Sequence, residues 1–309
     1  MTLYATTPAC WAPGLDGDAA WKDWLEGRRA IERSAALPPL SFTAPLFRRR
    51  LSQLSRMTVQ VVHDALELAG PGAGPGAASL KQSFVSFRGE LARQLSINRT
   101  LITEQDVLPA SFSLSVFNTP MALASMACGL TGGYSVLFPP ADAFYDGFCA
   151  ACAPLLCEEE DRLLFVYADE AVPAEYAAFC PDDADPLAFA CVLSASVPCG
   201  SSIAFDHTAA AGMTPAAFLR MLLRGASAGG PGFTSSVSFT GGIDCDSGST
   251  GAGSGHRNVR DGSTGSVSST GSTGGSAVRV PGSTVAGGGG NSSGRIRDCG
   301  NSGGRSAGQ

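Results

Sequence analysis

The feature that most limits how this chain can fold is an abrupt change in composition after Arg224. Every leucine and methionine of the sequence lies before that point, and the 85 residues that follow contain 25 of the 39 glycines. A Gly/Ser/Thr-rich segment of this kind loses more conformational entropy on ordering than its few apolar groups can return. We therefore predict a folded domain over residues 1–224 and a disordered tail over residues 225–309.

The tail also differs from the rest of the chain in charge. Its six arginines and four aspartates give it a net charge of +2. Because the whole chain has a net charge of −6, residues 1–224 carry −8. The tail contains no leucine, glutamate or lysine. Two origins stay open: a functional flexible linker, or the product of reading past a natural stop or in a shifted frame.

Composition sets limits on the class of protein. A chain with 44% hydrophobic and 16% charged residues can build one sizeable core or two small ones. The net charge of −6 and a pI near 5.1 argue against nucleic-acid binding, which usually needs a clustered basic excess. The one basic cluster, Arg48–Arg50, is short, and we interpret it as a solvated helix face.

The sequence carries no sign of export or of membrane insertion. Residues 1–15 have no positively charged segment and are interrupted by Pro8 and Pro13, so no secretory signal is expected. No run approaches the roughly 20 apolar residues of a membrane span. We expect a cytoplasmic protein whose ten cysteines stay reduced and act mainly as small buried hydrophobes.

Between residues 51 and 224 the apolar pattern alternates between helical and extended periods, which is typical of an α/β fold with crossover helices. The predicted helices cover residues 51–68, 90–97, 120–128, 142–156 and 215–223, and the predicted strands cover 82–87, 112–117, 134–138, 163–168 and 187–194. The runs 163–168 and 187–194 are continuously apolar, which predicts strands that are covered on both faces of the sheet.

Four stretches, in this order, carry a resemblance to a known family. They are LFRRRLSQLSRM (46–57), SFVSFRGEL (83–91), SFSLSVFNTP (111–120) and LFVYADE (164–170). Over about residues 10–224 the chain resembles the β-ketoacyl synthase-like N-terminal domain family, in its chain-length-factor-like form. The resemblance implies half of a thiolase-type fold, a mixed and mostly parallel sheet covered by helices, related to the condensing enzymes of fatty-acid and polyketide synthesis.

A condensation needs a thiolate that holds the acyl group and an oxyanion hole of backbone N–H donors. The resemblance places the nucleophile on the turn after the strand 134–138, where this sequence reads Pro139-Pro140-Ala141-Asp142. That turn has no cysteine, proline offers no N–H, and Asp142 would oppose an anionic transition state. We interpret Asp142 as a helix N-terminal carboxylate and the turn as a pseudo-active site.

The histidines support the same interpretation, because condensing enzymes also use neutral histidines to polarise a thioester carbonyl. His63 falls in a predicted helix, His207 in a predicted loop and His256 in the tail. No pair of catalytic histidines is recognisable, and we interpret His63 as a partly exposed helical residue.

Cysteine offers the main rival interpretation. Cys149, Cys152 and Cys157 fall close together, and Cys149/Cys152 has the C-x-x-C form of redox and zinc sites. A zinc site would want a second pair, and the other cysteines do not repeat the spacing. The acidic run 158–161 is the opposite of the electropositive setting that activates a thiol. Buried packing is therefore the expected role of Cys149 and Cys152.

Together, these observations predict a non-catalytic, chain-length-factor-like subunit without cofactor or metal. The family implies that it acts beside a β-ketoacyl synthase subunit and an acyl carrier protein, in fatty-acyl, polyketide or aryl-polyene chain assembly. Two alternatives stay open: an acyltransferase of the β-ketoacyl synthase type with an unrecognised nucleophile, for which Cys149 is the first candidate, and a thiol or metal-binding module built on Cys149, Cys152 and Cys157.

Overall fold

A computed structural model of the chain describes residues 1–70, 77–179, 184–196 and 202–228. The tail predicted to be disordered lies outside the described residues from residue 229 onward, and so does most of the glycine-rich insert 70–76. The last helix passes the predicted domain boundary and ends at Ala228.

Within the described residues, the core is a mixed sheet with the strand order β4-β3-β5-β6-β1-β7, and β2 also pairs with β6. β3 is parallel to both β4 and β5, and the remaining pairs are antiparallel. The mixed sheet is thus confirmed, but the expectation that it is mostly parallel is wrong, because only the pairs β3–β4 and β3–β5 of these six are parallel. The strands are β1 (Thr2–Ala5), β2 (Ala9–Trp11), β3 (Lys81–Val85), β4 (Tyr134–Leu137), β5 (Arg162–Asp169), β6 (Leu187–Ser194) and β7 (Ile203–Asp206).

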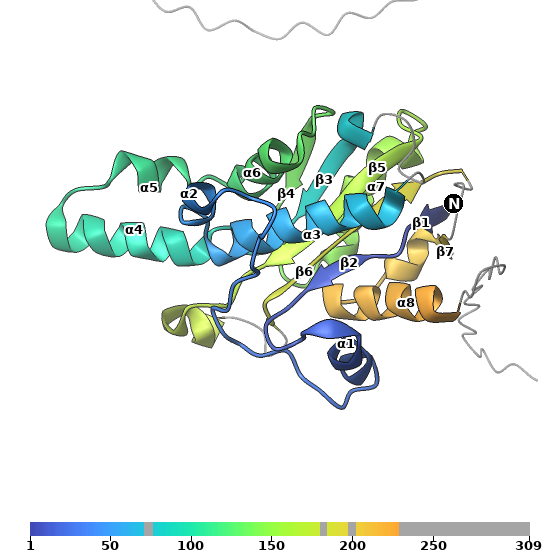
Figure 1. Cartoon of the computed structure of the whole chain (residues 1–309), viewed down its shortest axis with the longest axis horizontal. Coiled ribbons are helices and arrows are strands. Elements are labelled where there is room, and N and C mark those ends of the chain that lie inside the picture. Colours follow the sequence, from blue (N-terminus) through green and yellow to red (C-terminus); the bar gives the residue numbers. More distant parts are fainter. Residues whose placement is uncertain (71–76, 180–183, 197–201, 229–309) are drawn as a thin grey trace, which may run out of the picture. The chain divides into compact units, whose positions relative to one another are not determined.

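Helices cover both faces of this sheet (Figure 1). Alternate side chains of β5 point to opposite faces: Phe165 belongs to the core cluster that includes residues from 17–25, 144–156 and 215–228, whereas Val166 belongs to the cluster that includes residues from 53–69 and 119–128. This double cover explains the unbroken apolar runs of β5 and β6. The covering helices are α1 (Gly17–Leu25), α3 (Gln53–Ala69), α6 (Thr119–Cys128), α7 (Phe144–Leu156) and α8 (Pro215–Ala228).

The helix ends follow local sequence signals. Ser52 caps α3 by accepting the N–H of Ser55 at 3.0 Å, and Gly129 ends α6 in the left-handed conformation at φ +66°. Thr214 accepts the N–H of Ala217 at 3.2 Å at the start of α8.

Two helices lie apart from the layers. α4 (Leu91–Glu104) and α5 (Pro109–Ser113) have no buried residue, and they project from the sheet beside the short helix α2 (Pro45–Arg48). We call α4, α5 and their connection the arm. The predicted strand 112–117 is wrong here, because Phe112 lies in α5 and turns follow it. Pro109 starts a helix well, and the alternating apolar residues face solvent instead of a sheet neighbour.

Short 3-10 helices complete the description: η2 (Ala77–Ser79), η3 (Ala174–Phe179) and η4 (His207–Ala210). No helix among the described residues is both long and apolar enough to cross a membrane.

Candidate functional site: the turn after strand β4

The turn after β4 lies at the carboxyl end of the three parallel strands, the edge at which open α/β sheets bind ligands. Pro140, Ala141 and Asp142 are exposed, and the Pro140 carbonyl accepts the N–H of Ala143 at 2.9 Å. The predicted helix start at Asp142 is two residues early, and Asp142 does not cap the helix. α7 begins at Phe144, its N-cap is Ala143, and no side chain caps it. The turn closes through its own backbone, which moves Asp142 outside the helix.

Helix α7 packs tightly against this turn. A Cβ atom on Gly147 would lie 2.6 Å from Cγ of Pro139, which is closer than van der Waals contact allows. Glycine at this position therefore lets the first turns of α7 approach Pro139, and Pro139 has a packing role. Sequence patterns missed this contact, because a glycine inside an apolar helix gives no sign of what lies opposite it.

A cavity of about 40 Å³ adjoins the turn. Ala141, Arg88 and Tyr167 are among the residues that line it. Pockets that bind small molecules usually measure about 300–1,000 Å³. Among the described residues, this cavity is therefore smaller than such a site.

Asp169, the last residue of β5, organises the floor of this edge and is fully buried. Its carboxylate accepts the hydroxyls of Ser86 at 2.8 Å and Tyr167 at 2.7 Å, and the backbone N–H groups of Phe87 and Arg88 at 3.1–3.2 Å. These bonds fix the loop after β3 against β5. The sequence signal was the acidic pair Asp169-Glu170, directly after the predicted strand 163–168. Sequence analysis assigned no role to this pair.

Glu170 lies next to Asp169 and joins the starts of two helices. Its carboxyl group accepts the N–H of Leu54 in α3 at 3.4 Å and that of Ala92 in α4 at 2.8 Å. Burial raises the pKa of Glu170 to about 7, and the nearby charges of Glu90 and Asp169 add to the rise, while the two N–H donors act against it.

Glu90 completes this polar base of the arm. It is fully buried and accepts the hydroxyls of Ser52 at 2.7 Å and Ser55 at 2.6 Å. The Arg93 Nε donates to its second oxygen at 3.1 Å. Two buried carboxylates, Glu90 and Glu170, thus tie the start of α4 to the start of α3.

The three candidate cysteines differ in burial along α7. Cys152 is buried and Cys149 is half-buried within the helix, whereas Cys157 is exposed at its C-terminal end. Burial raises the pKa of the Cys152 thiol well above its ordinary value, and the neighbouring Cys191 thiol contributes further. The Cys152–Cys191 neighbourhood links α7 to β6 and was not predicted. Cys180 and Cys199 lie outside the described residues.

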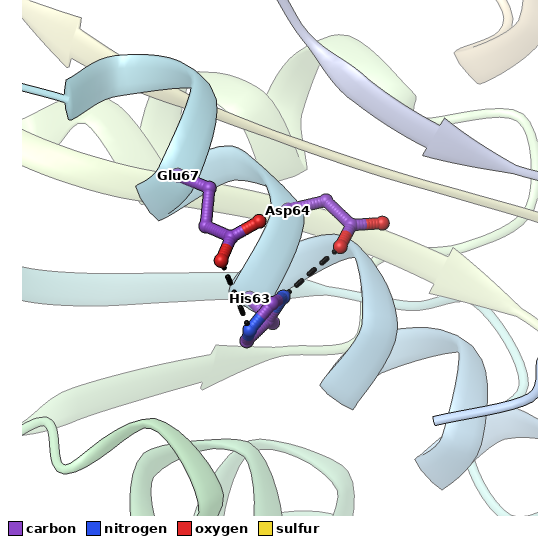
Figure 2. A group of neighbouring side chains, drawn as sticks. All are labelled: His63, Asp64 and Glu67. Carbon is purple, nitrogen blue, oxygen red and sulfur yellow. Dashed lines mark hydrogen bonds and ion pairs between the residues drawn. The ribbon is translucent and has the colours of Figure 1, made fainter. Parts of the chain in front are cut away.

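The histidines lie in separate elements: His63 in α3 and His207 at the start of η4, while His256 lies outside the described residues. Figure 2 shows His63 between two carboxylates of its own helix, with Nδ1 3.1 Å from Asp64 and Nε2 3.5 Å from Glu67. The His63 ring stacks on the Phe42 ring, with 3.6 Å between the ring centroids. Glu67 is 70% exposed, so we interpret the group as surface polar contacts along one helix.

Comparisons with known proteins identify the fold and the family. A search of curated protein sequences gives no match. Among solved structures, the chain is similar to a chain of a ketosynthase in complex with its chain length factor from Xenorhabdus doucetiae, with 24% identity, a TM-score of 0.54, and coverage of 64% of this chain and 80% of that one.

A second similar structure is the ishigamide ketosynthase/chain length factor, with 13% identity, a TM-score of 0.50, and coverage of 63% of this chain and 62% of that one. At these identities the likeness shows the shared fold, the mixed α/β fold of the thiolase-like ketosynthases. The profile described as "Beta-ketoacyl synthase, N-terminal domain" matches residues 21–219. The chain therefore belongs to the β-ketoacyl synthase N-terminal domain family.

Proposed function

We propose that this protein is a non-catalytic, chain-length-factor-like subunit that supports a partner β-ketoacyl synthase. An acyl carrier protein would deliver the growing chain to that partner, in fatty-acyl, polyketide or aryl-polyene assembly. The names of the similar structures support the kind of partner, since both combine a ketosynthase with a chain length factor.

The observation that carries the proposal is the turn after β4. The family resemblance implies that a condensing enzyme carries its thiol there, and this chain has Pro139-Pro140-Ala141-Asp142. Ala141 cannot act as a nucleophile, and Pro140 has no N–H to donate to an oxyanion. The cavity of about 40 Å³ beside Ala141 is smaller than the space that small-molecule sites usually provide. A supporting role needs neither a nucleophile nor that space.

The acyltransferase alternative would rest on Cys149, and its setting is unfavourable for a nucleophile. Cys149 lies within α7 rather than at a helix N-terminus, where the dipole would favour a thiolate. The setting of the cysteine-module alternative is also unfavourable, because Cys152 is buried whereas Cys157 is exposed at the C-terminal end of α7.

Intact-protein mass spectrometry tests the proposal directly. The purified chain, incubated with an acyl carrier thioester, should gain no acyl mass, while an active ketosynthase in a parallel reaction should gain it. The Cys149→Ala variant is the matched control, and it should behave as the natural sequence does. An adduct on Cys149, or on any serine of the folded domain, would establish the acyltransferase instead.

Co-purification tests the partner. The ketosynthase encoded beside this protein should form a stable complex with it, and removing this subunit should lower the activity of the synthase or alter the length of its product. If that synthase is fully active and specific alone, the proposed supporting role is wrong.

A further inference from the structure

A groove of about 920 Å³ separates the arm from the body of the domain. One wall is the segment around α2, with Phe47, and the opposite wall is α5, with Leu114. The floor is α6, where Met126 is 68% exposed. The volume falls within the range of small-molecule sites, and a flexible methionine adapts readily to an apolar ligand.

The charged residues in this groove are all of one sign. Arg49, Arg50 and Arg93 line it, and no acidic residue is among the described lining residues. A cationic groove is unexpected on a domain whose charge is strongly negative, so it marks a local field that attracts anions.

Arg49 and Arg50 also lack internal partners. Among the described residues, neither guanidinium group makes an ion pair or a side-chain hydrogen bond, whereas the neighbouring Arg48 donates to the carbonyls of Pro39 and Leu40. Arg93 is held by Glu90 and also donates to the Arg50 carbonyl at 3.0 Å. Two adjacent arginines therefore remain available at the rim of an apolar groove.

We propose that this groove binds an anionic amphiphile, that is, a carboxylate or phosphate carried on an unbranched apolar chain. The head group would pair with Arg49 and Arg50, and the chain would lie along Phe47, Leu114 and Met126. Such a ligand would also give the arm something to pack against, since no residue of α4 or α5 is buried. The site lies outside the turn after β4 and does not depend on the proposed function.

Net charge favours an anionic amphiphile over the tail of the chain itself as the ligand of this groove. Residues 229–309 contain six arginines and four aspartates, so they carry a net positive charge. A cationic groove attracts an anionic ligand and repels a cationic segment.

Isothermal titration calorimetry of the full chain, below the critical micelle concentration, tests the proposal. Dodecyl phosphate, dodecanoate or both should bind with 1:1 stoichiometry, and the preferred one identifies the head group. Dodecyl maltoside, which has no charge, and inorganic phosphate, which has no chain, should each bind at least tenfold more weakly. High salt should weaken the binding of the anionic probes, because these arginines are exposed.

The double variant Arg49→Gln/Arg50→Gln should bind the anionic probe at least tenfold more weakly, and Met126→Glu should weaken it as well. Arg29→Gln is the matched control, since Arg29 is equally exposed, lies outside the groove and has no side-chain partner among the described residues. Circular dichroism verifies that each variant folds, and the probe series on the natural sequence stands if one does not. Equal affinity of the double variant, tight binding of dodecyl maltoside, or self-association of the chain with no amphiphile bound would overturn the proposal.

Discussion

The layered sheet and the arm are built in opposite ways. In the sheet, β5 and β6 are buried along almost their whole length. The ring centroid of Phe218 in α8 lies 5.0 Å from that of Phe148 and 5.8 Å from that of Phe205. In the arm no residue of α4 or α5 is buried, and Ile102 and Phe112 are 79% and 62% exposed.

The difference shows that apolar burial stabilises one region and polar anchoring holds the other. The base of the arm is fixed by Glu90 and Glu170, which receive hydrogen bonds from α3 and α4. An exposed ion pair between Arg99 and Glu175 is a further tie, and such pairs contribute little. Mutations in the sheet should therefore change global stability, whereas changes at the base of the arm should change its local order and its response to pH.

The largest expected difference is between the sheet and the tail, in their resistance to proteolysis. We expect limited proteolysis to remove residues 229–309 quickly and to leave a resistant fragment that ends near Ala228, because the tail has too few apolar groups to protect it. Mass spectrometry of the fragments measures this. A tail that survives as long as the sheet would contradict it.

Within the folded domain, Phe218→Ala should destabilise most. Phe218 is fully buried among aromatic rings, and a Phe→Ala change in a core costs about 3–5 kcal/mol of unfolding free energy. Phe112→Ala in the arm is the matched control, and it should stay within about 0.5 kcal/mol. Urea unfolding measures both. Similar losses for the two variants would remove the contrast between sheet and arm.

The pH dependence of stability should report Glu170. The pKa of its carboxyl group is about 7 in the folded chain against 4.5 normally, so the folded state holds this proton more tightly. Its contribution to the unfolding free energy is fully present below about pH 4.5 and is lost as the pH rises to about 7, with a magnitude of about 3 kcal/mol. Urea unfolding at several pH values measures the slope.

Glu170→Gln keeps the hydrogen-bond acceptor without the charge, and it should flatten the stability profile between about pH 4.5 and 7. Hydrogen exchange at Ala92 should become less sensitive to pH in the same variant, because its N–H donates to Glu170. Glu67→Gln changes a carboxyl group that is 70% exposed and serves as the control. An unchanged slope in Glu170→Gln would assign the pH effect to another group.

Cys149→Ala/Cys152→Ser should act through packing alone. Cys152 is buried near Cys191, so the double change should cost about 1–3 kcal/mol of unfolding free energy. Unfolding curves and elemental analysis check this together. Stoichiometric zinc that disappears in the double variant would establish the metal-binding alternative.

Asp142→Ala should give the smallest effect, below about 0.5 kcal/mol, because Ala143 rather than Asp142 is the N-cap of α7. Ser52→Ala is the comparison at a true cap, since Ser52 accepts the Ser55 N–H and also donates to Glu90. That variant should cost about 1–2 kcal/mol. A loss for Asp142→Ala as large as that for Ser52→Ala would restore Asp142 as a helix-stabilising residue.

Much of the fold could be predicted from the sequence where the pattern was strong and local. The predicted strand 187–194 matches β6 residue for residue, and the predicted helix 120–128 differs from α6 by one residue at its start. The N-terminal strands β1 and β2 were missed, because they are short and gain their hydrogen bonds from β6 and β7, far along the chain. The stretch 112–117 alternated like a strand, but no neighbouring strand is available to it.

The sequence by itself determined the alternation of strands and helices, the absence of a cysteine on the turn after β4, and the family to which the chain belongs. These properties depend on residue types and on local periodicity. Only the tertiary structure decided which distant groups meet: Glu170 with the starts of α3 and α4, Gly147 with Pro139, and the arginines with the apolar groove. Such contacts join residues that are separated along the chain, and no local pattern encodes the partner across that distance.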